Sequence, residues 1–233
     1  MIAMSNFSNT LFWAVLIGWI LSVVLHEFAH GLVAYWGGDY TIRERGGLTL
    51  NPLQYVDPMF SIVLPIIFLF MGGIPLPGGS TYIRRDLLRS RSWDSAVSLA
   101  GPFTNLLLFV GCAIPLLPRF GWLVPGTEPT QAQYLLGALA FLQIVTVVLN
   151  LVPVPPLDGF QALSPWLPAD LRRTLTTPPW STGLFIGFFV IVWKLHVIGF
   201  IFDHIAAPAL GAMGFDAYGQ FFFIRAFIQA FSS

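Results

Sequence analysis

Two histidines and a glutamate occur together in the sequence HEFAH, residues 26–30, inside an apolar run that begins near Leu11. Residues four apart on a helix share one face, so the imidazoles of His26 and His30 can converge on a single metal ion. Glu27 points about 100° away from His26, outside the ligand set but close enough to reach a water on the metal. The pattern therefore predicts a metal site with an adjacent general base.

The position of this motif favours function over packing. Ionisable side chains deep in a membrane segment are costly and usually mark functional sites. The alternative is that His26, Glu27 and His30 only pack against other helices, which is the weaker interpretation of three such residues in one membrane segment.

A third metal ligand is expected elsewhere, because catalytic zinc typically takes three protein ligands and leaves one position for water. The candidate is Asp158, near the end of the stretch NLVPVPPLDG that starts at Asn150. Its three prolines end the preceding helix, and the freed backbone groups must then line a cavity rather than face lipid. Alone, Asp158-Gly159 would indicate a turn at the membrane surface. Beside a two-histidine motif that lacks a third ligand, the carboxylate is the stronger interpretation.

The composition is that of a membrane protein. Hydrophobic residues make up 56% of the chain and charged residues 9%, and the mean hydropathy is +0.75. Eleven basic and eleven acidic residues cancel and form no basic face, which argues against nucleic-acid binding. The lone Cys112 cannot form an internal disulfide and is interpreted as a packing residue. We expect one membrane-embedded domain over residues 1–233, without a cleavable signal peptide in residues 1–25 or an appended soluble module.

Apolar segments predict an all-α polytopic membrane protein with five to six transmembrane helices. They are residues 11–36, 58–73, 97–117, 134–152, 183–202 and, less regularly, 205–231. The second segment is short and runs into GGIPLPGG at residues 72–79, so we expect a broken or re-entrant segment near the active site. The last is interrupted by Pro208 and several glycines, and is either a kinked span or an interfacial helix with Arg225 outward.

Further stretches complete an ordered set of motifs. Residues 100–105, AGPFTN, open one helix, and the LDG stretch follows a later one; with HEFAH they resemble the site-2 protease family of intramembrane zinc metalloproteases. Residues 47–53, GLTLNPL, further resemble the compact bacterial and archaeal branch of that family. The match covers roughly residues 12–160, so we expect a catalytic core at about 11–160 and C-terminal helices at about 183–231.

The resemblance implies one Zn²⁺ per chain and assigns roles to individual residues. The zinc ligands carried over from the family are His26, His30 and Asp158. The catalytic glutamate carries over onto Glu27. The GxxxN motif corresponds to Gly101 and Asn105, and the asparagine ahead of the LDG stretch to Asn150; both imply substrate contact or a part in the site architecture.

A family member would hydrolyse a peptide bond within or near a transmembrane segment of another membrane protein, such as a single-span or signal-peptide-like segment in the lipid bilayer. The substrate helix must unwind before attack, and its exposed backbone is expected to pair with the stretch around residues 74–82. Residues 75–80, PLPGGS, depart from the loop that relatives often carry. Two other functions stay open, a metal transporter and a catalytically inactive membrane scaffold, and so does the oligomeric state.

The order of the segments also predicts the topology. His26 and His30 lie in the second half of the first helix, and Asp158 follows the 134–152 helix, so those two helix ends must share one side of the membrane to share a metal. That side then carries eight arginines, whereas the opposite side carries Arg119. The positive-inside rule places the active site toward the cytoplasm, in the plasma membrane of a prokaryotic cell, with the N-terminus outside. The expected cytoplasmic loops are 38–57, 74–96 and 153–182.

A second group of polar residues lies near the C-terminal end of the 183–202 segment. Lys194 and His196 lie within it, and Asp203 and His204 follow. A second metal site is one interpretation. A snorkelling lysine and an interfacial Asp-His pair are commoner and are preferred.

Overall fold

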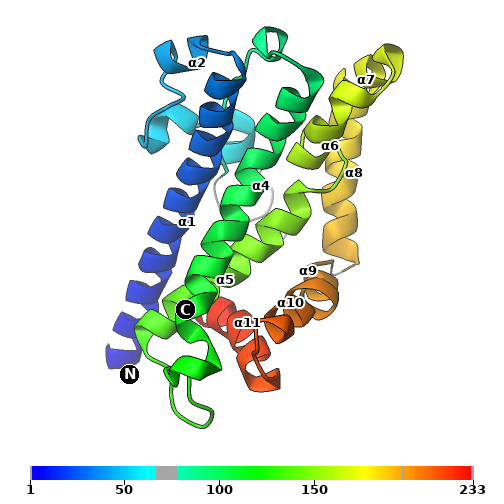
Figure 1. The fold of residues 1–233 in the computed structure, drawn as a ribbon. Coiled ribbons are helices and arrows are strands. Elements are labelled where there is room, and N and C mark those ends of the chain that lie inside the picture. Colours follow the sequence, from blue (N-terminus) through cyan, green and yellow to red (C-terminus); the bar gives the residue numbers. More distant parts are fainter. Residues whose placement is uncertain (1, 64, 67–77, 196, 232–233) are drawn as a thin grey trace.

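Every regular element of the described chain is a helix. The computed structural model describes all residues except 1, 64, 67–77, 196 and 232–233. Among these described residues, three helices are long and apolar enough to cross a membrane: α1 (Ile2–Gly37), α4 (Arg91–Ala113) and α5 (Gln131–Asn150), which lie side by side in Figure 1. The expected all-α membrane fold is confirmed.

The number of spans agrees only roughly with the five to six expected. A fourth candidate is formed by α7 (Ala169–Thr176) and α8 (Trp180–Lys194), which are bent by 64° at the break between them. The 183–202 segment, expected to be one helix, is divided between α8 and α9 (Val197–Ile201), with residue 196 outside the described chain.

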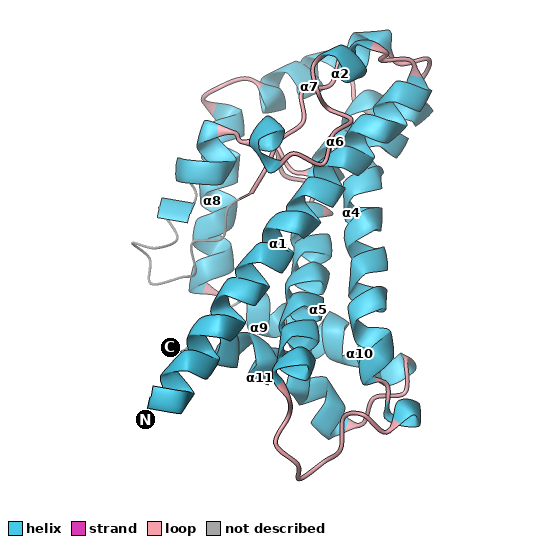
Figure 2. Ribbon diagram, turned by 90° about the vertical axis from the view of Figure 1, so that its left-hand side faces the viewer, coloured by secondary structure: helices cyan, strands magenta, loops and turns pink. Residues whose placement is uncertain are grey.

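The C-terminal helices lie across the end of the bundle at which α5 begins (Figure 2). They are α9, a π-helical turn (Phe202–Ala206), α10 (Ala207–Ala212) and α11 (Ala217–Phe231). Helix α11 packs closely on α5, because a Cβ on Gly137 would lie 2.9 Å from the Cβ of Ala226. Arg225 points outward and its guanidinium lies 3.6 Å from the Glu128 carboxylate.

Local sequence explains where α4 and α5 begin. The Ser90 hydroxyl accepts a hydrogen bond from the Trp93 amide at the start of α4. Thr130 and Gln133 form a capping box at the start of α5, each side chain bonding the other residue's backbone amide. Each cap satisfies an amide that the first turn of its helix would otherwise leave without a hydrogen-bond partner.

The chain between α1 and α4 returns close to its starting point. It forms α2 (Thr41–Glu44), a 3-10 turn (Pro52–Tyr55) and a π-helical turn (Pro58–Val63), and then a non-helical stretch that we call the 78–84 segment. The Gly78 amide donates to the Phe60 carbonyl at 3.0 Å, and the Ser61 hydroxyl donates to the Gly78 carbonyl at 2.7 Å. Gly78 therefore lies beside Phe60 and Ser61. The re-entrant path stays a prediction. Residues 64 and 67–77, which include half of the predicted 58–73 segment, lie outside the described chain.

The two ends of the bundle carry different charges. The end of α1, the start of α4, the end of α5 and the short helices α6 (Asp158–Leu163) and α7 lie at one end, the upper one in Figure 1. The arginines at this end are Arg43, Arg45, Arg84, Arg85, Arg89, Arg91, Arg172 and Arg173. The other end has Arg119, Lys194 and Arg225. HEFAH and the LDG stretch therefore come together at the arginine-rich end.

Candidate metal centre

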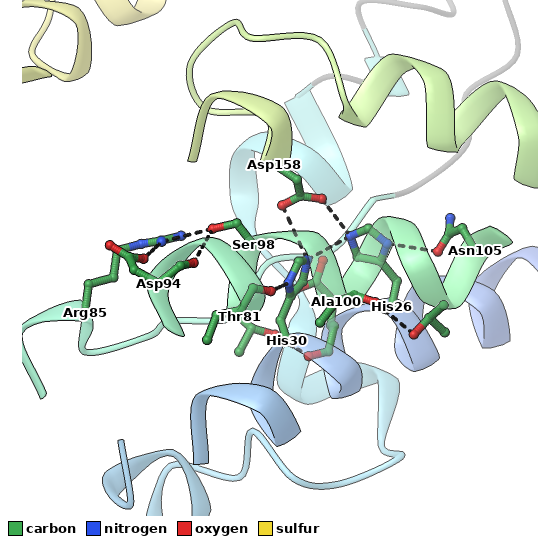
Figure 3. Close-up of polar contacts among 12 residues, drawn as sticks. His26, His30, Thr81, Arg85, Asp94, Ser98, Ala100, Asn105 and Asp158 are labelled. Atoms are coloured by element: carbon green, nitrogen blue, oxygen red, sulfur yellow. Dashed lines mark hydrogen bonds and ion pairs between the residues drawn. The ribbon is translucent and has the colours of Figure 1, made fainter. Parts of the chain in front are cut away.

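Helix α1 presents His26 and His30 one turn apart toward the inside of the bundle. Both imidazoles are buried, and their Nε2 atoms lie 3.0 Å apart. Asp158, the first residue of α6, reaches them from the opposite side: its carboxylate oxygens lie 3.2 Å from Nε2 of His26 and 3.4 Å from Nε2 of His30 (Figure 3). The three ligand atoms lie within 4.8 Å of one another.

Helix α4 fixes the orientation of both rings. Nδ1 of His26 donates to the side-chain oxygen of Asn105 at 2.9 Å, and Nδ1 of His30 donates to the Val97 carbonyl at 2.7 Å. Because each Nδ1 carries the ring proton, each Nε2 presents a lone pair toward Asp158. Outer partners of this kind hold a metal-binding histidine in the correct tautomer.

The donor set fits zinc. Two imidazole nitrogens and one carboxylate oxygen converge with lone pairs facing one another, an arrangement that a cation between them satisfies. Two histidines and one carboxylate form a typical ligand set for catalytic zinc, with a fourth position left for water. A bound ion would be held by His26, His30 and Asp158.

Gly101 makes room for this site from α4. A Cβ at this position would lie 2.4 Å from Nε2 of His30 and 2.5 Å from both Nε2 and Cε1 of His26. No side chain larger than hydrogen fits there without moving the ligand atoms themselves. The backbone of α4 therefore lies directly against the metal-binding face of α1.

Glu27 lies beside the ligands and lines the same cavity, which has a volume of about 370 Å³. Its side chain is buried. The 78–84 segment covers it: a Cβ on Gly79 would lie 3.1 Å from Cγ of Glu27, and the Thr81 hydroxyl donates to the Glu27 carbonyl at 3.2 Å. The cavity thus contains a carboxylate next to the metal ligands but separate from them.

The remaining walls divide into an apolar and a polar part. Aromatic and aliphatic side chains that line the cavity are Trp19, Val23, Phe60, Ile83, Leu149, Pro156, Leu157, Phe185 and Phe189. Phe60 and Phe185 meet edge to face with ring centroids 5.9 Å apart, which closes the wall between the π-helical turn and α8. Polar side chains on the lining, apart from the ligands and Glu27, are Ser80, Thr81, Arg85, Asn105, Thr146, Asn150 and Gln161. An apolar cavity with a few convergent polar groups is typical of a binding site.

Comparison with known proteins identifies the family to which the chain belongs. No family model and no solved structure matches the chain. It is 38% identical over 200 residues to "Putative zinc metalloprotease Rip2" of Mycolicibacterium smegmatis, which is 82% of this chain and 74% of that protein. It is 34% identical over 159 residues to "Putative zinc metalloprotease YwhC" of Bacillus subtilis, which is 67% of this chain and 70% of that protein. Both relatives are site-2 protease family members. The chain belongs to the site-2 protease family.

The structure of this site-2 protease brings the expected site residues together. His26, His30 and Asp158 form a single cluster, and Glu27, Asn105 and Asn150 line the cavity beside it. Gly101 lies under the ligand atoms. Asn105 has a contact that the sequence did not indicate, since its side-chain oxygen bonds His26. Its contact with a substrate stays a prediction, as does that of Asn150.

The second group of polar residues forms no comparable cluster. Within the described part of this site-2 protease, His26, His30 and Asp158 are the one group of three or more potential ligands. The His204 ring stacks on Phe200 at 4.2 Å, and its Nδ1 donates to the Phe200 carbonyl at 3.1 Å. His196 lies outside the described chain.

Other residues at the centre were not identified from the sequence. Val97 acts through its carbonyl, so its side chain carries no signal. Thr81 and Gly79 lie in a Gly/Pro-rich stretch whose position over Glu27 depends on the fold. Phe185 belongs to an apolar segment of this site-2 protease that contains several aromatic residues, and the sequence does not indicate which of them faces the cavity.

Proposed function

We propose that this protein is an intramembrane zinc metalloprotease that hydrolyses peptide bonds within or near transmembrane segments of other membrane proteins. The observation that carries the proposal is the convergence of His26, His30 and Asp158 beside Glu27 in a cavity bounded by membrane-length helices. Family membership supports the same reaction class.

The residues divide the chemistry between them. His26, His30 and Asp158 would hold one zinc ion per chain, which would act as a Lewis acid toward water and the scissile carbonyl. Glu27 accepts the proton of the attacking water and passes it to the leaving amide nitrogen. Asn105 keeps the His26 ring in its ligating tautomer, and the Val97 carbonyl does the same for His30.

The substrate is a membrane-embedded segment that unwinds locally in the cavity. Alternate amides of the 78–84 segment are already used, because Gly78 donates to Phe60 and Ser80 donates to Tyr55. The intervening amides of Gly79 and Thr81 donate to no carbonyl of the described chain and are free to pair with an extended substrate backbone. The apolar wall receives the substrate's side chains, and Asn150 adds a polar contact at the rim.

The site opens toward the cytoplasm of a prokaryotic cell, and the protein is a multi-pass component of the plasma membrane. Eight arginines lie at the end of the bundle that carries the site, against three basic residues at the other end. The positive-inside rule assigns the arginine-rich end to the cytoplasm.

The test is cleavage of a single-span membrane substrate, reconstituted in vesicles, by the wild type and by Glu27→Gln. The substitution keeps the shape of the side chain and removes a buried ionisable group, so folding and zinc content should persist. The cleavage rate should fall by ~10²-fold or more, the usual loss for a positioned acid–base group. Glu44→Gln is the matched control, because Glu44 is exposed on α2 and should leave the rate unchanged.

The same experiment separates the two other functions. A metal transporter would move zinc across the vesicle and would respond little to Glu27→Gln. An inactive scaffold would bind zinc and cleave nothing in either form. Cleavage by Glu27→Gln at a near wild-type rate would refute the proposed mechanism.

A further inference from the structure

A carboxylate outside the metal centre is fully buried at the end of α1. Asp39 follows Gly37-Gly38, and its side chain has no exposed surface. Gly38 has a φ of +121°, and a Cβ there would lie 2.7 Å from the Leu87 carbonyl oxygen. The chain therefore turns sharply after α1 and buries Asp39 against the loop that precedes α4. A buried carboxylate is costly unless hydrogen bonds satisfy it.

Three residues donate to this carboxylate. The Thr41 hydroxyl donates to Oδ1 at 2.5 Å. Nη2 of Arg45 lies 3.2 Å from Oδ1 and 3.0 Å from Oδ2. The backbone amide of Arg84 donates to Oδ2 at 2.8 Å. Both oxygens are thus occupied, and one of the donors is the last amide of the 78–84 segment. We call Asp39 with these three partners the Asp39 clamp.

The Asp39 clamp holds one end of the segment that covers the catalytic glutamate. At the other end, the Gly78 and Ser80 amides donate to carbonyls of the preceding turns. Between the two attachments, Thr81 bonds the Glu27 carbonyl and Gly79 packs on the Glu27 side chain. The Arg45 guanidinium also lies over the Tyr82 ring, 4.9 Å from its centroid, so Arg45 contacts the 78–84 segment directly as well as through Asp39.

We propose that Asp39 is a positioning residue for the protease reaction. It holds the 78–84 segment in place beside Glu27. A substrate paired with that segment then has its scissile bond at a fixed position relative to the metal ligands. The inference rests on the proposed function. Buried ion pairs are weak contributors to stability, and a role in fixing one conformation is their better-attested use. A displacement of about 1 Å at a reacting centre can cost ~10²-fold in rate.

Asp39→Asn tests the inference with little change in shape. The asparagine amide has one oxygen and one NH₂ group, so an NH₂ donor replaces one of the two acceptor oxygens. That donor faces either the Arg84 amide or the donors of Thr41 and Arg45, and the hydrogen bonds on that side are lost. We expect the zinc content to be unchanged and kcat per zinc-loaded molecule to fall by about tenfold or more. The KM for a membrane-embedded substrate should change less than kcat, because the apolar wall that receives the substrate's side chains is unaltered by the substitution.

Two further measurements separate positioning from general stability. Amide hydrogen exchange in the 78–84 segment should accelerate in Asp39→Asn, while exchange in α1 and α4 stays at the wild-type rate. Asp86→Asn is the matched control: its carboxylate bonds the Arg84 side chain at 2.7 Å but is exposed and lies outside the cavity. That variant should keep wild-type kcat, KM and exchange.

Thr81→Val provides a second route to the same result, because it removes the hydroxyl that bonds the Glu27 carbonyl at nearly constant volume. Its kcat should also fall, and the double variant with Asp39→Asn should lose less than the product of the two single losses. Wild-type kcat and exchange in Asp39→Asn, or a loss explained fully by lost zinc, would overturn the inference. An inactive wild type would instead overturn the proposed function. In that case the hydrogen-exchange measurement alone would test whether Asp39 holds the 78–84 segment.

Discussion

Replacing Gly101 with alanine is the most direct perturbation of the metal centre. The added methyl group would lie 2.4 Å from Nε2 of His30 and 2.5 Å from Nε2 of His26, whereas ordinary van der Waals contact begins near 3.4 Å. One or both imidazoles must therefore retreat by about 1 Å. Zn–N bonds are about 2.0–2.1 Å long and a working site tolerates deviations of about 0.2 Å. Gly101→Ala should therefore lose its zinc.

The magnitude follows from what the ligands lose. Disturbing only an outer partner of a metal ligand usually costs ~10–100-fold in affinity, and Gly101→Ala displaces the ligand atoms themselves. We expect the zinc affinity to fall by at least ~10²-fold, with proteolysis falling in parallel. Helix α4 is not weakened, because alanine is about 1 kcal/mol more favourable than glycine inside a helix. Helical content and membrane insertion should stay at wild-type values.

The assay is zinc content after equilibration with a chelator of known zinc affinity, measured by elemental analysis on purified protein. Gly111→Ala is the matched control, since it lies on the same helix and an added Cβ meets nothing within 4 Å. That variant should bind zinc like the wild type. Full zinc occupancy and activity in Gly101→Ala would refute the placement of α4 against the ligands.

Further predictions concern single contacts of the site and the topology. Asn105→Leu removes the acceptor for Nδ1 of His26, so zinc affinity should fall by ~10–100-fold in chelator competition, and unchanged affinity would contradict the orienting role. Asp158→Ala leaves two imidazoles and should lose bound zinc; retention of zinc and activity would move the third ligand elsewhere. In a background without the native cysteine, Leu87→Cys should react with an impermeant thiol reagent only from the cytoplasmic side and Thr127→Cys only from outside, and the reverse pattern would invert the topology.

The geometry of the candidate metal centre was largely predictable, because the spacing that sets it is local in the sequence. The i, i+4 spacing of His26 and His30 fixes their shared face on any helix. Asp158 required a second argument, from prolines that end a helix and from the need for a third ligand, and the structure brings it to 3.2 Å from His26. The partners of the Nδ1 atoms were not predictable in the same way. A carbonyl such as that of Val97 exists at every residue, and only the packing of α1 on α4 selects it.

The fold was predictable where apolar length decides it and less so elsewhere. Helices α1, α4 and α5 follow from long uncharged stretches. The 183–202 segment has similar hydropathy, yet α8 ends at Lys194 and the chain continues in short helices across the end of the bundle. Average hydropathy measures how apolar a stretch is but carries no information on whether its hydrogen-bond ladder is continuous.

The two candidate metal-binding histidines differ in whether a substitution can remove the group that orients the ring. The ring of His26 is oriented by a side chain, that of Asn105, which an amino-acid substitution can remove. The ring of His30 is oriented by the Val97 main chain, which every substitution at that position retains. A single substitution at position 105 can therefore change the orientation and basicity of the His26 ring. The second ligand has no such outer side chain, so a substitution at position 105 should change the zinc affinity more than a substitution at position 97.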